Sequence, residues 1–108
     1  MTHWLPIRYR DFWDFPRAFV VEFDRTLFLF DSLFDYETDD YEDHYTVYVV
    51  PEDIGERIDD ISWTDLGHRC ERVGQIAVHA IEFDESKRRA INERVFAQIE
   101  GLSATSGE

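Results

Sequence analysis

Two neighbouring stretches of the chain carry the apolar pattern of a β-hairpin. Residues 18–23 and 26–30 are rich in large apolar side chains, and Asp24-Arg25 stands between them. A two-residue turn there places apolar pairs across both faces of the hairpin, so we expect it at the centre of the fold. Glycine is preferred where Arg25 stands, so a longer loop stays open as an alternative. The predicted pairs are Phe23–Thr26, Val21–Phe28 and Phe19–Phe30 on one face, with Val20–Leu29 and Glu22–Leu27 on the other.

Three further segments carry the short patterns of β-strands. Residues 5–10 alternate apolar and basic positions, residues 45–50 combine β-branched residues with tyrosine, and residues 75–83 alternate again. Residues 62–74 between the last two have no clear period and predict a structured loop. In the first strand the side chains expected to point inward are those of Leu5, Ile7 and Tyr9.

Two segments predict helices. Pro51 with acidic residues after it favours a short helix that ends near residues 59–60. Asp84 is a typical N-cap, and residues 85–100 predict a longer C-terminal helix that Gly101 ends. The apolar stripes expected to be buried are Ile54, Ile58 and Ile61 in the first helix, and Ile91, Val95 and Ile99 with Phe96 and Leu102 in the second.

Together these elements predict an α+β fold: one small domain with an antiparallel sheet of about five strands, a short middle helix and a C-terminal helix. The segment VGQIAVHAIEF (residues 73–83) resembles the closing strands of an SH3-type barrel, in which a glycine precedes a short apolar strand. That resemblance implies a sheet rolled into an SH3-like small barrel, and an open sheet is the alternative. We expect the domain to span residues 1–100 and a flexible tail to span residues 101–108.

Composition supports a folded chain: 44% of the 108 residues are hydrophobic and 16% are aromatic. Cys70 is the only cysteine, so an intrachain disulfide is excluded and a reducing compartment is favoured. The N-terminal residues contain no apolar core of a secretory signal, and no apolar run approaches the roughly 20 residues of a membrane span. We therefore expect a cytoplasmic protein that does not bind membranes.

Charge is concentrated in the middle of the chain. The net charge is −13, and residues 11–65 hold 17 acids against 3 bases, a balance of −14. A field of this sign repels nucleic acid and favours a basic protein as partner, although it also keeps a protein soluble. No glycine-rich phosphate loop is present, which argues against the common nucleotide chemistries, and no cofactor is predicted.

The densest acidic segment is DSLFDYETDDYEDH, residues 31–44, which connects two predicted strands. Seven carboxylates and no Lys or Arg lie between Asp31 and Asp43. An EF-hand register beginning at Asp35 fails, because Asp40 stands where glycine is required and Thr46 where glutamate is required. A looser cation site and a solvated loop remain as alternatives, and no metal site is predicted.

Tyrosines interleave with these acids, and aromatic anchors among charges are typical of protein interfaces. The sequence therefore predicts a non-enzymatic interaction module that docks a basic protein, in the manner of small acidic inhibitor or immunity proteins. Besides Tyr45 at its end, the predicted docking surface comprises Asp35, Tyr36, Glu37, Asp39, Asp40, Tyr41, Glu42 and Asp43.

A small enzyme is a second hypothesis. Its active site would use Asp65, His68 and Cys70, which lie within six positions of one another. A pocket for it could be formed by the three tryptophans. None of these residues has the spacing of a known zinc site or nucleophile motif, so no catalytic residue is predicted. The tryptophans are Trp4, Trp13 and Trp63.

A homo-oligomeric structural subunit is a third hypothesis, assembled through exposed aromatic side chains at Phe12, Trp13 and Phe15. Separately, Lys87-Arg88-Arg89 places three cations in the first turns of the predicted C-terminal helix, where the helix dipole disfavours them. We expect this basic run to pair with the acidic residues of 31–43.

Overall fold

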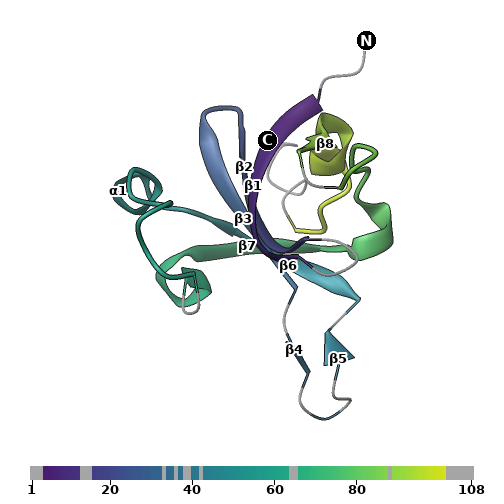
Figure 1. The fold of residues 1–108 in the computed structure, drawn as a ribbon, viewed down its shortest axis with the longest axis horizontal. Coiled ribbons are helices and arrows are strands. Elements are labelled where there is room, and N and C mark those ends of the chain that lie inside the picture. Colours follow the sequence, from purple (N-terminus) through teal and green to yellow (C-terminus); the bar gives the residue numbers. More distant parts are fainter. Residues whose placement is uncertain are drawn as a thin grey trace.

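The protein forms one six-stranded antiparallel sheet in the computed structural model (Figure 1). The strands lie in the order β7-β6-β3-β2-β1-β8, so the first strand of the chain lies beside the last. The structure describes residues 4–12, 16–32, 34–35, 37, 40–41, 43–63, 66–87 and 89–101, with backbone alone at 11–12, 34–35 and 40–41. The strands are β1 (Trp4–Phe12), β2 (Pro16–Phe23), β3 (Thr26–Asp31), β6 (His44–Val49), β7 (Glu71–Ala77) and β8 (Ala90–Asn92).

The central hairpin β2–β3 has the predicted register. Phe19 pairs with Phe30 and Val20 with Leu29, as the alternation of apolar residues requires. The turn is the two-residue one, with Asp24 at φ 54° and Arg25 at φ 65°. A left-handed backbone at two non-glycine residues is unfavourable, and the paired apolar residues on both sides hold it in place.

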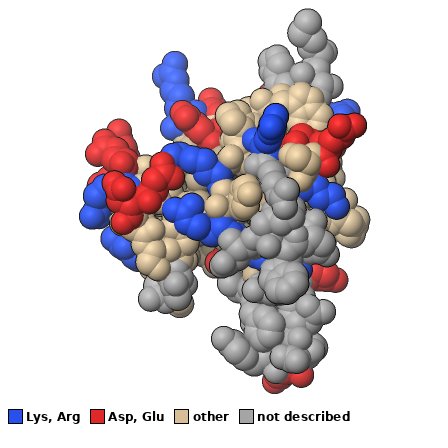
Figure 2. Space-filling view, viewed as in Figure 1, with Lys and Arg blue, Asp and Glu red and all other residues tan. Residues whose placement is uncertain are grey.

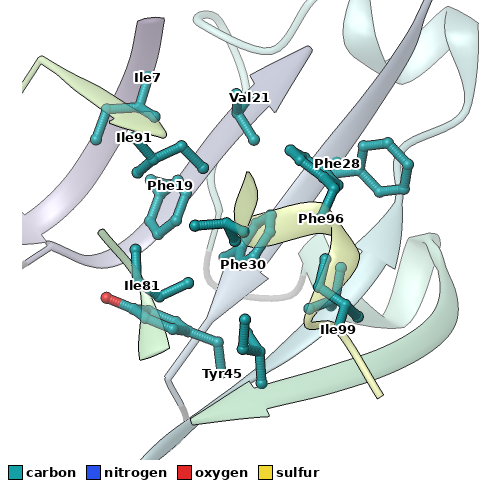
Figure 3. Packing of buried hydrophobic residues seen from close by; sticks show 13 residues of the cluster. Ile7, Phe19, Val21, Phe28, Phe30, Tyr45, Ile81, Ile91, Phe96 and Ile99 are labelled. Carbon is teal, nitrogen blue, oxygen red and sulfur yellow. The ribbon is translucent and has the colours of Figure 1, made fainter. Parts of the chain in front are cut away.

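One face of the sheet packs into the main cluster, which Figure 3 shows from close by. The rings of Phe19 and Phe30 stack with centroids 4.7 Å apart, and Tyr45 meets Phe19 edge to face at 5.3 Å. Such pairs add stability beyond the apolar area they bury. The residues of the main cluster are Ile7, Phe19, Val21, Phe28, Phe30, Tyr45, Val47, Ile76, Ile81, Ile91, Val95, Phe96 and Ile99.

The opposite face packs into the second cluster, made by Val20 and Leu29 with residues from the segment between β6 and β7. This segment contains α1 (Glu52–Gly55) and the 3₁₀ turn η1 (Leu66–Arg69). Of the predicted stripe, Ile54 and Ile58 are buried here and Ile61 is partly buried, although the α-helix itself is only one turn long. The residues of the second cluster are Val20, Leu29, Val50, Ile54, Ile58 and Leu66, with Ile61, Trp63 and others packed against them.

The predicted C-terminal helix over residues 85–100 is wrong. The structure has a turn after Asp84, the short strand β8, and the 3₁₀ turn η3 (Glu93–Ala97). The reason is tertiary: Ile91 pairs with Leu5 of β1, and Lys87 adopts φ 62°, which no α-helix tolerates. The fold is therefore mostly β, with few helical turns.

The stripe expected of that helix is nevertheless buried. Ile91, Val95, Phe96 and Ile99 all belong to the main cluster, because a strand followed by a 3₁₀ turn also brings them to one side. Leu102 lies outside the described residues.

The predicted strand over residues 75–83 is only partly correct. β7 begins earlier, at Glu71, inside the predicted loop, and ends at Ala77. Its partner β6 begins at His44, opposite Ala77, and after one more backbone hydrogen bond, from Val78 N–H to the Asp43 carbonyl oxygen at 2.9 Å, the chain turns into η2 (Val78–Ala80). The sheet is open, so the barrel suggested by the SH3 resemblance does not form.

Residues 81–101, here called the closing segment, run from one edge of the sheet to the other across the main cluster (Figure 1). At the β7 edge Gln75 and Glu100 exchange backbone hydrogen bonds of 3.0 and 2.8 Å. Gly74 permits this approach: a Cβ there would overlap the Glu100 carbonyl oxygen and lie 2.9 Å from the Ile99 Cγ2. The segment thus covers the main cluster without closing a barrel.

Candidate functional site

The acidic connection between β3 and β6 contains a small hairpin of its own. β4 (Phe34–Asp35) pairs with β5 (Asp40–Tyr41), in a register that sets Phe34 opposite Tyr41 and Asp35 opposite Asp40. β4 and β5 lie beyond the ends of β3 and β6, away from the six-stranded sheet (Figure 1). We call residues 31–43 the acidic hairpin. Like charges directly opposite each other destabilise a strand pair, so this arrangement does not serve stability.

The predicted docking surface is described in part. Glu37 and Asp43 are exposed, and the backbone of Asp35, Asp40 and Tyr41 is placed in the hairpin. Three further residues of that surface lie outside the described residues: Tyr36, Asp39 and Glu42.

Tyr45 is not part of this surface, contrary to the expectation that it interleaves with the acids. Its side chain is fully buried in the main cluster, and its hydroxyl donates a 2.6 Å hydrogen bond to the Pro16 carbonyl oxygen. A tyrosine on a central strand buries its ring when its hydroxyl finds such a partner. At the base of the hairpin His44 Nδ1 lies 3.6 Å from Asp43 Oδ1.

Metal binding gains no support from the side chains that the structure describes. Among them, no group of three or more His, Cys, Asp or Glu residues is placed to hold an ion.

The two described residues of the enzyme hypothesis, His68 and Cys70, lack the features of an active site. His68 is exposed on η1, and Cys70 packs partly buried against the second cluster. Burial raises the pKa of the Cys70 thiol, and the neighbouring Arg69 charge opposes this only in part. A nucleophilic cysteine requires the reverse shift. Asp65 lies outside the described residues.

The tryptophans do not line a common pocket in the described part of the chain. Trp4, opposite Asn92 at the β8 edge, is 45% exposed. Trp63 packs against the second cluster, and its Nε1 donates a 2.8 Å hydrogen bond to the Ile58 carbonyl oxygen. Trp13 and Phe15, together with the Phe12 side chain of the oligomer hypothesis, lie outside the description.

The predicted pairing between the basic run 87–89 and the acidic hairpin stays a prediction, because Arg88 and most side chains of the hairpin lie outside the described residues. Within the described residues, the Arg–carboxylate ion pairs join Arg8 to Asp59 at 2.8 Å and Arg94 to Glu82 at 3.0 Å. Neither involves the basic run, of which Arg88 lies outside the description.

The Asp84 side chain, predicted to cap a helix, binds the backbone N–H groups of a turn. Its carboxylate accepts hydrogen bonds from the backbone N–H groups of Ser86, Arg89 and Ala90 and from the Ser86 hydroxyl. Burial raises the pKa of Asp84, but these four hydrogen bonds outweigh it and hold the pKa well below its usual range. The carboxylate therefore holds the turn that leads into β8.

A groove that the sequence does not predict lies between the β2–β3 turn and α1. Its volume is about 610 Å³. A smaller hollow of about 230 Å³ lies beside η2 and Lys87. Sequence reasoning misses the groove because three separate segments of the chain form it, at residue 8, residues 22–27 and residues 49–56. The residues that line it are Arg8, Glu22, Arg25, Thr26, Leu27, Val49, Val50, Pro51, Glu52, Gly55 and Glu56.

Carboxylates gather around α1, on the left of the face in Figure 2. Glu52, Asp53, Glu56, Asp59 and Asp60 are all exposed there. This second acidic surface is separate from the acidic hairpin, because the two lie at opposite ends of β3 (Figure 1).

Comparison with protein-family models, with curated proteins and with solved structures finds no match to this chain. None of the helices in the described part of the chain combines the length and apolar character needed to cross a lipid bilayer.

Proposed function

We propose that the protein is a non-enzymatic interaction module that docks a basic protein through its acidic hairpin. The observation that carries the proposal is the placement of Asp35 and Asp40 directly opposite each other on β4 and β5, beyond the sheet. The exposed carboxylates of Glu37 and Asp43 lie on the same hairpin. A cationic partner would offset the repulsion expected of like charges that stand opposite each other in this register.

The net charge supports the same partner chemistry. A charge of −13 on 108 residues attracts basic proteins over long range and speeds their encounter at low salt. The same backbone register pairs Phe34 with Tyr41, and aromatic anchors contribute much of the binding energy in protein interfaces. In its sharpest form the proposal is an inhibitor or immunity role against a basic toxin or nuclease.

The test compares the wild-type chain with a hairpin variant, Asp35→Asn/Glu37→Gln/Asp39→Asn/Asp40→Asn, as bait in a host lysate at low ionic strength. The control is Glu71→Gln/Glu85→Gln, which removes two exposed acids outside the hairpin. We expect the wild type and the control to capture the same basic protein and the hairpin variant to lose it. Salt at about 0.5 M should release the captured protein from the wild type, because it screens the charges that hold the two together. Equal capture by all three proteins contradicts the proposal.

A captured partner then permits a direct measurement. If it is a nuclease or another enzyme, its activity is assayed with increasing amounts of the wild type and of the hairpin variant. Inhibition by the wild type alone supports the inhibitor role. Inhibition by both proteins would assign the contact to another surface.

A further inference from the structure

The groove between the β2–β3 turn and α1 has the form of a site for a long cationic side chain. Its floor is apolar: Leu27, Val49 and Val50 are half-buried or buried, and Pro51 continues the surface. Its walls carry ionised groups from β1, β2 and α1. An apolar floor with charged walls suits a side chain that combines a methylene stem with a charged end.

The walls of the groove carry more acidic than basic side chains. Arg8 forms an ion pair with Asp59, so its charge is already compensated. Glu22, Glu52 and Glu56 are exposed and take part in no ion pair within the described residues. Against these three carboxylates stands Arg25 on the turn. The surrounding acids of the α1 surface add to the same sign (Figure 2).

From this balance we propose that the groove binds an arginine side chain presented by an extended segment of a partner protein. The guanidinium would lie between carboxylates of β2 and α1, with its stem over Leu27 and Pro51. Arginine is favoured over lysine because its planar fork can meet two carboxylates at once. An anionic ligand is disfavoured, because it would find one uncompensated cation against three carboxylates. The inference does not depend on the acidic hairpin, since the groove lies at the other end of β3.

The experiment uses the ¹⁵N-labelled full chain and a capped tripeptide, acetyl-Val-Arg-Val-amide. The matched probe is the same peptide with citrulline in place of arginine, which keeps the shape and removes the charge. Chemical shifts of the backbone amides are followed through each titration. We expect the arginine peptide to shift the amides of Glu22, Leu27 and Glu52 and the citrulline peptide to shift them far less.

Three variants test the assignment. Glu22→Gln/Glu52→Gln should raise the Kd of the arginine peptide about threefold to tenfold, the size expected for two exposed charge pairs. The matched control Glu71→Gln/Glu85→Gln, with both substitutions outside the groove, should leave the Kd unchanged. Arg25→Gly, which suits the left-handed turn, should lower the Kd because it removes the opposing cation.

Several results would overturn the inference. They are equal binding of the citrulline peptide, no binding at millimolar peptide, and an equal effect of the groove variant and its control. Weaker binding of the arginine peptide by Arg25→Gly would also overturn it, because Arg25 would then not oppose the charge of the peptide. Shifts confined to residues 31–43 would overturn the groove site and leave the proposed role of the acidic hairpin standing.

Discussion

At the scale of single residues, Asp84 shows how a correct local signal can lead to a wrong element. An aspartate before a run of helix-forming residues predicts an N-cap, and its side chain does accept backbone N–H groups. The groups it binds belong to a turn, because Lys87 is left-handed and β8 pairs with β1. Capping chemistry is visible in the sequence, whereas the tertiary partner of the next strand is not.

The carboxylate of Asp84 makes stability depend on acid. Its pKa is lowered in the folded state relative to the ordinary value near 4, so its ionised form stabilises the fold above that value. The contribution is lost as the pH falls below about 4 toward the folded pKa. We expect Asp84→Ala to lower the free energy of unfolding by about 1–2 kcal/mol at neutral pH, because several backbone donors lose their acceptor.

The measurement is urea unfolding of the wild type and Asp84→Ala from neutral pH down to about pH 3, across the ordinary aspartate pKa. The difference between their free energies of unfolding should stay constant above about pH 5 and shrink below about pH 4. Glu85→Ala is the control, since Glu85 is the adjacent exposed acid. A difference that does not change with pH would show that the Asp84 charge is not what holds the turn.

Other residues mark where sequence reasoning succeeds. The register of β2 and β3 follows from the alternation of Phe19, Val21, Phe28 and Phe30, because a one-residue slip would turn all of them to the wrong face. Tyr45 marks the opposite case. It follows the acidic hairpin in the sequence, but its place is set by β6 and by a carbonyl 29 positions away.

At the scale of elements, the closing segment and β7 meet where Gly74 leaves no room for a side chain. We expect Gly74→Ala to lower the free energy of unfolding by on the order of 2 kcal/mol, because Glu100 must move away from the strand. Amide exchange at Gln75 and Glu100, whose N–H groups donate to each other's carbonyl oxygens, should become faster.

The control for this prediction is Gly55→Ala. A Cβ at Gly55 would meet only the end of the flexible Leu27 side chain, at 3.3 Å, so the change in stability should be small. Both substitutions restrict the unfolded chain in the same way, so their difference isolates the clash. Equal stabilities of the two variants would mean that the closing segment does not lie against Gly74.

The acidic connection shows how far an element can be predicted. Its position between two core strands follows from the apolar patterns on either side. The pairing of β4 with β5 does not, because Asp35 opposite Asp40 contradicts the rule by which strand partners are recognised. The groove is hidden from the sequence for another reason: Arg8, Glu22 and Glu52 meet only once the sheet order is known.

At the scale of the whole molecule, repulsion among the excess carboxylates opposes folding. With a net charge of −13, added salt should screen this repulsion and raise the melting temperature. We expect the free energy of unfolding to rise by about 1 kcal/mol between roughly 10 mM and 500 mM NaCl. In a domain of this size that corresponds to a rise of about 4–8 °C in the melting temperature.

Thermal unfolding followed by circular dichroism measures the slope of the melting temperature against the NaCl concentration. The hairpin variant, with four fewer negative charges, should show a smaller slope than the wild type, and Glu71→Gln/Glu85→Gln should fall between them. A melting temperature that falls with NaCl would show that favourable ion pairs, such as Arg8–Asp59, outweigh the repulsion.

The position of β8 beside β1 has a consequence for synthesis on the ribosome. Pro6, near the start of the chain, pairs with Ala90, and the β7 edge is completed only by Glu100. A nascent chain can form the β2–β3 hairpin early, but β1 has one free side until residues 90–92 have emerged. Such distant pairings make folding slow. We infer that the sheet is completed only after residues 90–100 have emerged, and that its exposed strand edges need protection from other chains until then.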